Sequence, residues 1–237
     1  PFFGGMAGDD RTLSGSYVFT KGKETNHGVM ALVLDADKVE LQGTAITGWK
    51  KMGISRTVTH SKGNLLYAID DQPAVDMYLK YLGREDRTGD KEYKVLDELS
   101  MHYPFITPRD NGETVLRTPL KIDHAENALV IDVEMPTGTQ FWFSMPPDFD
   151  IVDHIMHSAS RMKEVTRMEA DALLIFSCAG RVDVLGPLIQ SENEGLQKIW
   201  NSPMAGFFTY GEYGPDPSGN REFHSGACCW VAIQEKS

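Results

Sequence analysis

The chain has 237 residues, 41% of them hydrophobic and 10% aromatic, which is enough to bury one large core or two modest ones. Its 34 acidic and 23 basic residues leave a net charge of -11, and the basic residues are scattered, so the surface repels phosphate backbones and argues against nucleic-acid binding. No apolar stretch reaches the roughly 18 residues that span a bilayer, and the first residues lack a signal-peptide pattern. We therefore expect a globular, cytoplasmic protein without membrane insertion, whose three cysteines are free thiols in a reducing compartment.

The first 83 residues indicate a set of short strands followed by one helix. The chain begins at Pro1 with an apolar, glycine-rich run typical of a domain interior, from which we infer that part of this module is missing. Segments rich in β-branched and aromatic residues follow, and they predict a mainly antiparallel sheet. Pro73 suits a helix start and Gly83 a helix end, so the apolar spacing between them predicts a helix. The expected strands cover residues 16–20, 29–34, 39–49, 55–60 and 64–70.

A charged segment, residues 84–92, is expected to link the first module, residues 1–83, to a second one, residues 93–237. An apolar stripe predicts a long helix from about residue 149 to about residue 168. The buried strand after it is expected to end near Cys178. Sheets covered by helices predict a mixed α/β fold of the α+β class. Further strands are expected at residues 116–122, 128–135, 139–145, 206–214 and 223–233, and another helix at residues 188–200.

Two parts of the sequence resemble each other. In each, a glycine-rich apolar strand reaches a glycine and an acid, Gly8–Asp9 or Gly211–Glu212, and a histidine, His27 or His224, later begins a hydrophobic strand. Either an internal duplication of the two modules or chance explains this similarity. If it is a duplication, Asp9 and His27 form a second candidate site.

Several segments resemble the FIST family. The run SCAGR at residues 177–181, the run PMAGFFTYGEYGP at residues 203–215 and the closing NREFHSGACCWVAI are similar to its C-terminal module. The stretch from GGMAGDD to VTHSKGNLLYAIDDQPAVDMYLKYLG is similar to the second half of its N-terminal module. This resemblance implies an intracellular sensory protein, not an enzyme, that binds a small ligand such as an amino acid. It also implies signalling through a separate histidine kinase, chemoreceptor or cyclic-dinucleotide enzyme, and one branch of the family binds haem and senses nitric oxide.

The first candidate ligand-binding residues are Cys178, Gly180 and Arg181, at the carboxyl end of the expected buried strand. Open sheets place ligand crevices at such ends, and glycine leaves the backbone free to turn toward a ligand. Arg181 offers a planar fork for a carboxylate or phosphate. The alternative is a core cysteine beside an arginine that pairs with a structural acid.

The second group of candidates is Tyr210, Gly211 and Glu212. The glycine permits close approach of the backbone to a ligand, and Glu212 could receive an ammonium group. Together with Arg181 it would complement both ends of an amino acid. The competing interpretation is that Arg181 and Glu212 pair with each other.

His224, with Asn220 nearby, is the third candidate. It could donate to a ligand, titrate near neutral pH, or be a structural histidine held by hydrogen bonds. In the alternative of a haem protein, His224 or His27 would bind the iron.

The same residues allow other chemistries. Cys178, His224 and Glu212 have the residue types of a cysteine-dependent enzyme, and a pure interaction scaffold without a pocket is a further alternative. His154 and His157 lie away from the apolar stripe of their helix, so we expect them to be solvated rather than metal ligands.

Overall fold

The computed structural model describes residues 1–10, 12, 14–84 and 99–236, and the chain divides into two compact units. Unit 1 is discontinuous and consists of Pro1–Gly48 and Asp148–Ser237, whereas unit 2 is the continuous segment Trp49–Pro147. Both contain strands and helices, so the predicted mixed α+β class is confirmed. The expected linker at residues 84–92 lies, apart from Arg84, outside the described residues, and the division into modules at that point stays a prediction.

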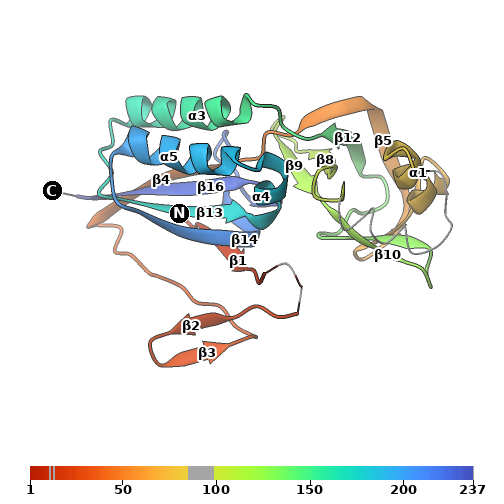
Figure 1. The fold of residues 1–237 in the computed structure, drawn as a ribbon, viewed down its shortest axis with the longest axis horizontal. Helices are drawn as coiled ribbons and strands as arrows, with labels where there is room; N and C mark the ends of the chain where they lie inside the picture. The colour runs from red at the N-terminus through yellow and green to blue at the C-terminus, as the bar shows by residue number, and fades with distance from the viewer. Residues whose placement is uncertain (11, 13, 85–98, 237) are drawn as a thin grey trace. The chain divides into compact units, whose positions relative to one another are not determined.

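Unit 1 is built on a sheet in the order β1-β14-β13-β16-β4, with β15 paired to β14 (Figure 1). Its pairs are antiparallel except for β13 with β14, which are parallel. Parallel neighbours require a crossover connection, and here it contains two helices, α4 (Ala179–Leu185) and α5 (Leu188–Trp200). The strands are β1 (Gly4–Ala7), β4 (Val39–Ile46), β13 (Ala172–Cys178), β14 (Met204–Pro215), β15 (Arg221–His224) and β16 (Cys228–Glu235).

Two helices, α3 (Ile151–Thr166) and α5 (Leu188–Trp200), lie on one face of this sheet (Figure 1). The buried residues of α5 recur every four positions, Glu192, Leu196 and Trp200, so the helix turns one stripe inward. Trp200 packs on Trp230 of β16 with 5.6 Å between ring centroids. Both helices were predicted, and both predictions are confirmed.

The adjacent cysteines of β16 point to opposite faces of the sheet, as the alternation of a strand requires. Cys228 belongs to the core beneath α3 and α5, whereas Cys229 packs with Ala45 and Ala227 on the other side. All three cysteines are free thiols, as predicted.

Unit 2 contains an eight-stranded sheet in the order β10-β11-β6-β5-β12-β8-β9, with β7 paired to β6 and the predicted helix α1 (Ala74–Tyr81) packed against it. Its core is mostly aliphatic, and aromatic rings, among them Tyr78, Phe105 and Phe141, pack against one another within it. The strands are β5 (Lys50–Lys62), β6 (Leu65–Ile69), β7 (Gln72–Pro73), β8 (Phe105–Pro108), β9 (Thr114–Arg117), β10 (Pro119–Asp123), β11 (Ala128–Ile131) and β12 (Gln140–Met145).

Three strand predictions are wrong. The expected strand at residues 116–122 covers parts of two separate strands, β9 and β10, which have different partners. Residues 29–34 form no strand, although they are apolar throughout, because no described segment of the chain pairs with them. The expected strand at residues 223–233 is two strands, β15 and β16, separated by a turn in which Gly226 has φ +68°. A backbone with positive φ cannot continue a strand, and glycine is the residue that adopts it at least cost.

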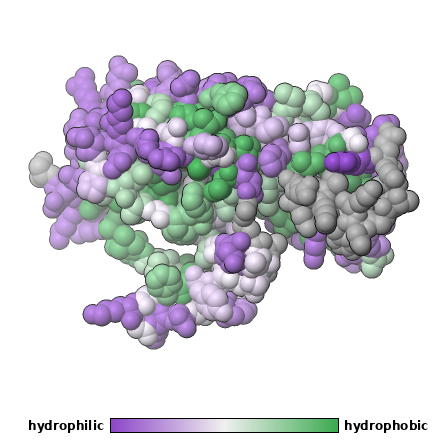
Figure 2. Space-filling view, viewed as in Figure 1, coloured by the Kyte–Doolittle hydropathy of each residue, from purple (hydrophilic) through white to green (hydrophobic). Residues whose placement is uncertain are grey.

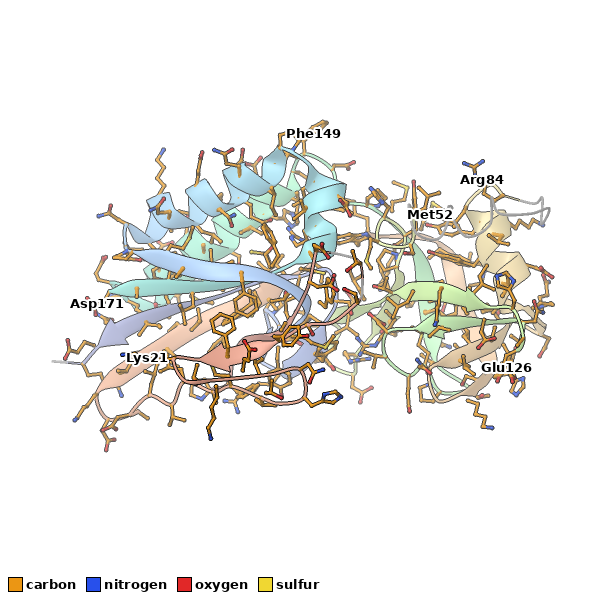
Figure 3. The ribbon with its side chains drawn as sticks, turned by 60° about the horizontal axis from the view of Figure 1, so that its bottom comes forward. Lys21, Met52, Arg84, Glu126, Phe149 and Asp171 are labelled. Carbon is orange, nitrogen blue, oxygen red and sulfur yellow. The ribbon has the colours of Figure 1, made fainter. Side chains whose placement is uncertain are left out.

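The segment before β4 belongs to unit 1 but lies outside its main sheet (Figure 1). It begins with the hairpin of β2 (Val18–Thr20) and β3 (Lys23–Thr25), whose turn contains Lys21 (Figure 3). Residues 28–35, which we name the arm, connect this hairpin to the turn before β4 and have no secondary structure.

Candidate functional site

The first predicted site residues lie where β13 passes into helix α4 (Ala179–Leu185). Cys178 ends the strand, and its backbone N–H donates to the Ala227 carbonyl oxygen at 2.9 Å. Gly180 and Arg181 belong to the first turn of α4. The sequence thus located the carboxyl end of the strand but missed the short helix that follows it.

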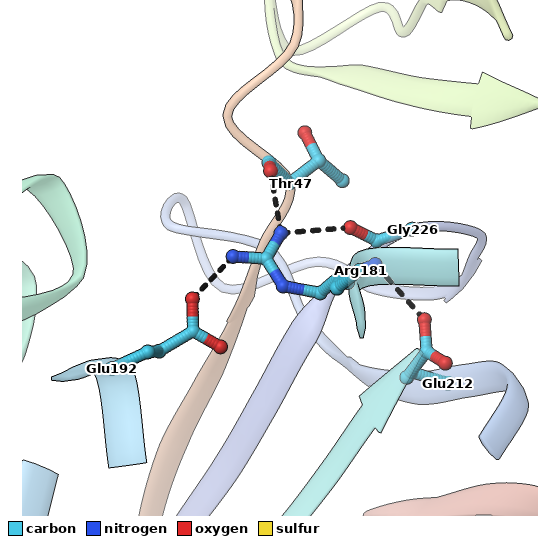
Figure 4. Close-up of polar contacts among 6 residues, drawn as sticks. Thr47, Arg181, Glu192, Glu212 and Gly226 are labelled. Atoms are coloured by element: carbon cyan, nitrogen blue, oxygen red, sulfur yellow. Dashed lines mark hydrogen bonds and ion pairs between the residues drawn. The ribbon is translucent and has the colours of Figure 1, made fainter. Parts of the chain in front are cut away.

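Arg181 is fully buried, and its guanidinium group already has protein partners. Nη1 donates to the carbonyl oxygens of Thr47 at 2.8 Å and Gly226 at 3.0 Å, and Nη2 forms an ion pair with Glu192 of α5 (Figure 4). The interpretation in which Arg181 pairs with Glu212 is therefore wrong. The acid that neutralises Arg181 comes from α5, so a ligand carboxylate would compete with Glu192 for Nη2. Arg181 Nε is buried and makes no hydrogen bond with a described residue.

Glu212, in the middle of β14, is buried among neutral hydrogen-bond donors. The Thr209 hydroxyl donates to Oε1, and the Ala227 backbone N–H donates to Oε2 at 3.0 Å. Burial raises the pKa of this carboxyl from 4.5 to about 8, although hydrogen bonds from Thr209 and Ala227 act in the opposite direction. The side chain is consequently mostly protonated at neutral pH.

The thiols next to Glu212 are not activated. Burial, with a smaller contribution from the Glu212 charge, raises the pKa of Cys178 from 9.0 to about 12, and the same two causes raise the pKa of Cys229 to about 12. A nucleophilic cysteine needs a lowered pKa and solvent access, whereas Cys178 is only 8% exposed. The geometry gives no support to a cysteine-dependent enzyme.

Native Cys178 should accordingly react with iodoacetamide at pH 8 at least about 100-fold more slowly than the same thiol in the urea-unfolded chain. The reason is that both burial and the high pKa keep the thiolate population small. Timed alkylation followed by mass spectrometry of the Cys178 peptide measures the rate. Rapid labelling confined to Cys178 would contradict the geometry and revive the enzyme interpretation.

Tyr210 and Gly211 have structural partners. The Tyr210 hydroxyl donates to Asp9 Oδ1, and Asp9 Oδ2 accepts from the Ser14 backbone N–H at 2.7 Å, so these contacts hold the loop after β1 against β14. Gly211 has φ +153°, and a Cβ atom there would overlap the ring of Phe223. Glycine at this position is explained by packing, without a ligand.

The three remaining candidates lie in different surroundings. His224 is buried opposite Glu212 in the β14–β15 pair, and its Nε2 donates to the Gly214 carbonyl oxygen at 3.2 Å. Asn220 is exposed in the turn before β15, where its Nδ2 donates to Ser218 at 3.3 Å. His27 is exposed where the hairpin meets the arm, with Nδ1 2.8 Å from Asn26 Oδ1.

These surroundings do not fit haem. Haem iron needs a histidine nitrogen that faces an apolar cavity, but His224 Nε2 is engaged by a carbonyl oxygen and His27 is in solvent. In the described part of the chain no three His, Cys, Asp or Glu side chains are arranged to hold a metal ion. His154 and His157 are exposed on α3, as predicted.

Sequence reasoning missed the residues that complete the cluster, which are Glu192, Thr209 and Ala227. Glu192 could have been noticed, because its spacing to Leu196 and Trp200 places an acid on the inner stripe of a helix. A buried acid there needs a cation, and Arg181 was the candidate. Thr209 and Ala227 have no comparable signal in the sequence.

Comparison with known proteins places the whole arrangement in one family. The family model of the FIST N domain matches residues 1–72, and that of the FIST C domain matches residues 74–215. No curated protein and no solved structure gives a significant match. None of the helices in the described residues is long and apolar enough to cross a membrane. Because the two matches cover most of its length, the chain belongs to the FIST family of sensory domains, which act in signalling and are not enzymes in general.

Proposed function

We propose that this protein is a cytoplasmic sensor of an amino acid or a similar small carboxylate, and that its ligand binds at the cluster around Cys178, Arg181 and Glu212. We also propose that it signals through a separate protein such as a histidine kinase, a chemoreceptor or a cyclic-dinucleotide enzyme. Membership of the FIST family supports the general sensory role. An amino-acid ligand is what the family resemblance implies, and the charges of Arg181 and Glu212 would complement its two ends.

The observation that carries the proposal is the environment of Glu212. Its carboxyl group is completely buried, receives hydrogen bonds from Thr209 and Ala227, and makes no ion pair with any described residue. A buried acid without a countercharge is held in its neutral form, and an ammonium group beside it would restore the ionised form. Titratable groups perturbed in this way are common at functional sites.

Arg181 supplies the complementary charge for the other end of an amino acid. Its guanidinium group binds Glu192 in the structure, so a ligand carboxylate would take the place of the α5 carboxylate. That exchange would loosen the contact between α4 and α5. A binding event would then alter the packing of a surface helix, which is the kind of change that a docked partner can detect.

The experiment is calorimetry against a panel of amino acids, measured at pH 6.5 and pH 8.5, with amines that lack a carboxylate and carboxylates that lack an amine as matched compounds. We expect amino acids to bind best, and to bind more tightly at the higher pH. Affinity rises with pH because the ligand ammonium group pairs with ionised Glu212. Below pH 8 the carboxyl group is protonated before binding, so binding must release this proton. Affinity should change by about tenfold per pH unit in that range.

Matched substitutions separate this effect from general changes. Glu212→Gln should remove both the preference for an amine and the pH dependence, whereas Glu194→Gln, at an exposed acid of α5, should leave both unchanged. Heat from no member of the panel, or an affinity that does not change with pH or in Glu212→Gln, would contradict the proposal.

A further inference from the structure

The arm presents an apolar surface to solvent. Val29 is 90% exposed and Val33 is 88% exposed, and Met30 and Leu32 between them are also more than half exposed. Figure 2 shows the arm as a green strip below the sheet of unit 1. Six consecutive apolar residues without a charge are typical of a strand that is buried on both faces. Their exposure indicates that a contact surface of the arm is uncovered.

Unit 1 has a second uncovered apolar element at the start of β14. Residues 204–208 pair with β13 on one side, but β1 pairs with β14 only from Thr209 onward. Among the described pairings the other side of residues 204–208 therefore has no strand next to it, and we name this stretch the free edge. Phe207 is 49% exposed and Phe208 is 44% exposed, and the two side chains project from opposite faces of the strand.

The two elements are complementary. A free edge offers a row of backbone N–H and C=O groups, which an added strand can pair, and natural edges are usually protected by charged residues or proline. The free edge, with the sequence MAGFF, contains no charged residue and no proline, and the arm, with GVMALVLD, contains no proline and one charged residue, Asp35 at its end. An arm with apolar side chains on both faces would cover Phe207 and Phe208 at the same time.

In the structure the arm is not paired with the free edge of its own chain, because no described pairing joins residues 28–35 to β14. The carbonyl oxygen of Asp35 accepts from the backbone N–H groups of Lys38 at 3.0 Å and Val39 at 2.9 Å, which ties the end of the arm to the start of β4. In the order of the sheet, β16 and β13 lie between β4 and β14. Val33, two residues before Asp35, can lie at most about 7 Å from it, so this part of the arm stays beside β4.

We propose that two copies of this chain form a symmetric dimer in which the arm of each copy pairs, as an added strand, with the free edge of the other. Each copy contributes one arm and one edge, so a two-fold arrangement uses every element once and closes on itself. The specific interfaces of stable dimers bury roughly 1,200–2,000 Å² or more. Two arms of six apolar residues and two pairs of phenylalanine side chains offer a surface of that order.

The test is the oligomeric state of the whole chain, measured by analytical ultracentrifugation over a range of concentrations. We expect a dimer for the unmodified protein. Val33→Asp in the arm and Phe208→Asp at the free edge should each weaken dimerisation by at least about 100-fold, because each buries an unpaired charge in the contact. Val165→Asp is the matched control, since Val165 is 73% exposed on α3 and distant in sequence from both elements, and it should leave the dimer intact.

A mixing experiment tests the reciprocal exchange directly. Val33→Asp keeps an intact edge and Phe208→Asp keeps an intact arm, so an equimolar mixture should recover a heterodimer held by one arm–edge contact. Native mass spectrometry resolves this species, and circular dichroism verifies that each variant is folded. A monomer at all concentrations, a dimer that survives both substitutions, or capture of the arm by a different protein only would overturn the proposal.

Discussion

Replacement of Arg181 by methionine is expected to lower the free energy of unfolding by about 3–5 kcal/mol. Arg181 and Glu192 are both completely buried, so loss of the guanidinium group leaves the Glu192 carboxylate without a countercharge in a water-free environment. The substitution also removes the donors to the carbonyl oxygens of Thr47 and Gly226. Urea denaturation followed by intrinsic fluorescence measures the loss, and Trp200 and Trp230 report on unit 1.

Two further variants show whether the loss of stability comes from the unpaired buried charge. The double variant Arg181→Met with Glu192→Leu should recover most of the loss, because a buried ion pair can often be replaced by apolar side chains of similar volume. Glu169→Gln is the control, since Glu169 forms an ion pair with Lys163 at 2.9 Å but its side chain is 76% exposed. That pair should contribute no more than about 1 kcal/mol. Equal, small losses in Arg181→Met and Glu169→Gln would show that burial gives the Arg181 pair no special importance.

The stability of unit 1 is expected to fall as the pH rises from about 5 to about 8. Burial raises the pKa of Glu212 from 4.5 in the unfolded chain to about 8, so over this range the folded protein holds a proton that the unfolded chain has released. Protonation of Glu212 thus contributes stability at low pH that is lost as the pH rises through the folded value. The slope for one proton is at most about 1.4 kcal/mol per pH unit, which amounts to several kcal/mol over the range.

Glu212→Gln tests whether this carboxyl is the cause. Glutamine resembles the neutral acid in shape and can still accept from Thr209, so the variant should lose most of the pH dependence and be more stable than the unmodified protein at pH 8.5. Urea denaturation at half-unit steps from pH 5 to pH 8.5 gives the profile. Glu194→Gln, at an exposed acid, should leave the profile unchanged. A Glu212→Gln profile parallel to that of the unmodified protein would assign the pH dependence to other groups.

The elements that sequence reasoning located are those whose pattern repeats several times. The stripe of α3 extends over four turns, and β13 is a continuous apolar run, so both were found close to their true ends. Helix α4 was missed because seven residues, with a glycine among them, contain less than two full periods. The strand expected at residues 29–34 failed for another reason, since strand formation requires a neighbour that the sequence of the segment does not specify.

The candidate site shows the same limit. The end of β13 was predicted as the place of Cys178 and Arg181, because a strand end is a local feature. The partner of Arg181 was not, because Glu192 lies eleven residues away, beyond a turn that joins two helices. Thr47 is 134 residues away and depends on the complete sheet. Such contacts follow from tertiary structure alone.

The insertion of unit 2 within unit 1 has a consequence for the order of folding. Lys50 and Met145 are paired residues of β5 and β12, so the inserted segment enters and leaves at neighbouring points of its own sheet. Once it has folded, it joins the two parts of unit 1 as a short tether would, instead of a free loop of about a hundred residues. Folding of unit 2 therefore already brings the ends of this loop together, and little further loss of chain entropy is needed when β4 pairs with β16. During synthesis the inserted unit can therefore fold first, and the sheet that holds Arg181 and Glu212 is completed only when the last strand, β16, has emerged.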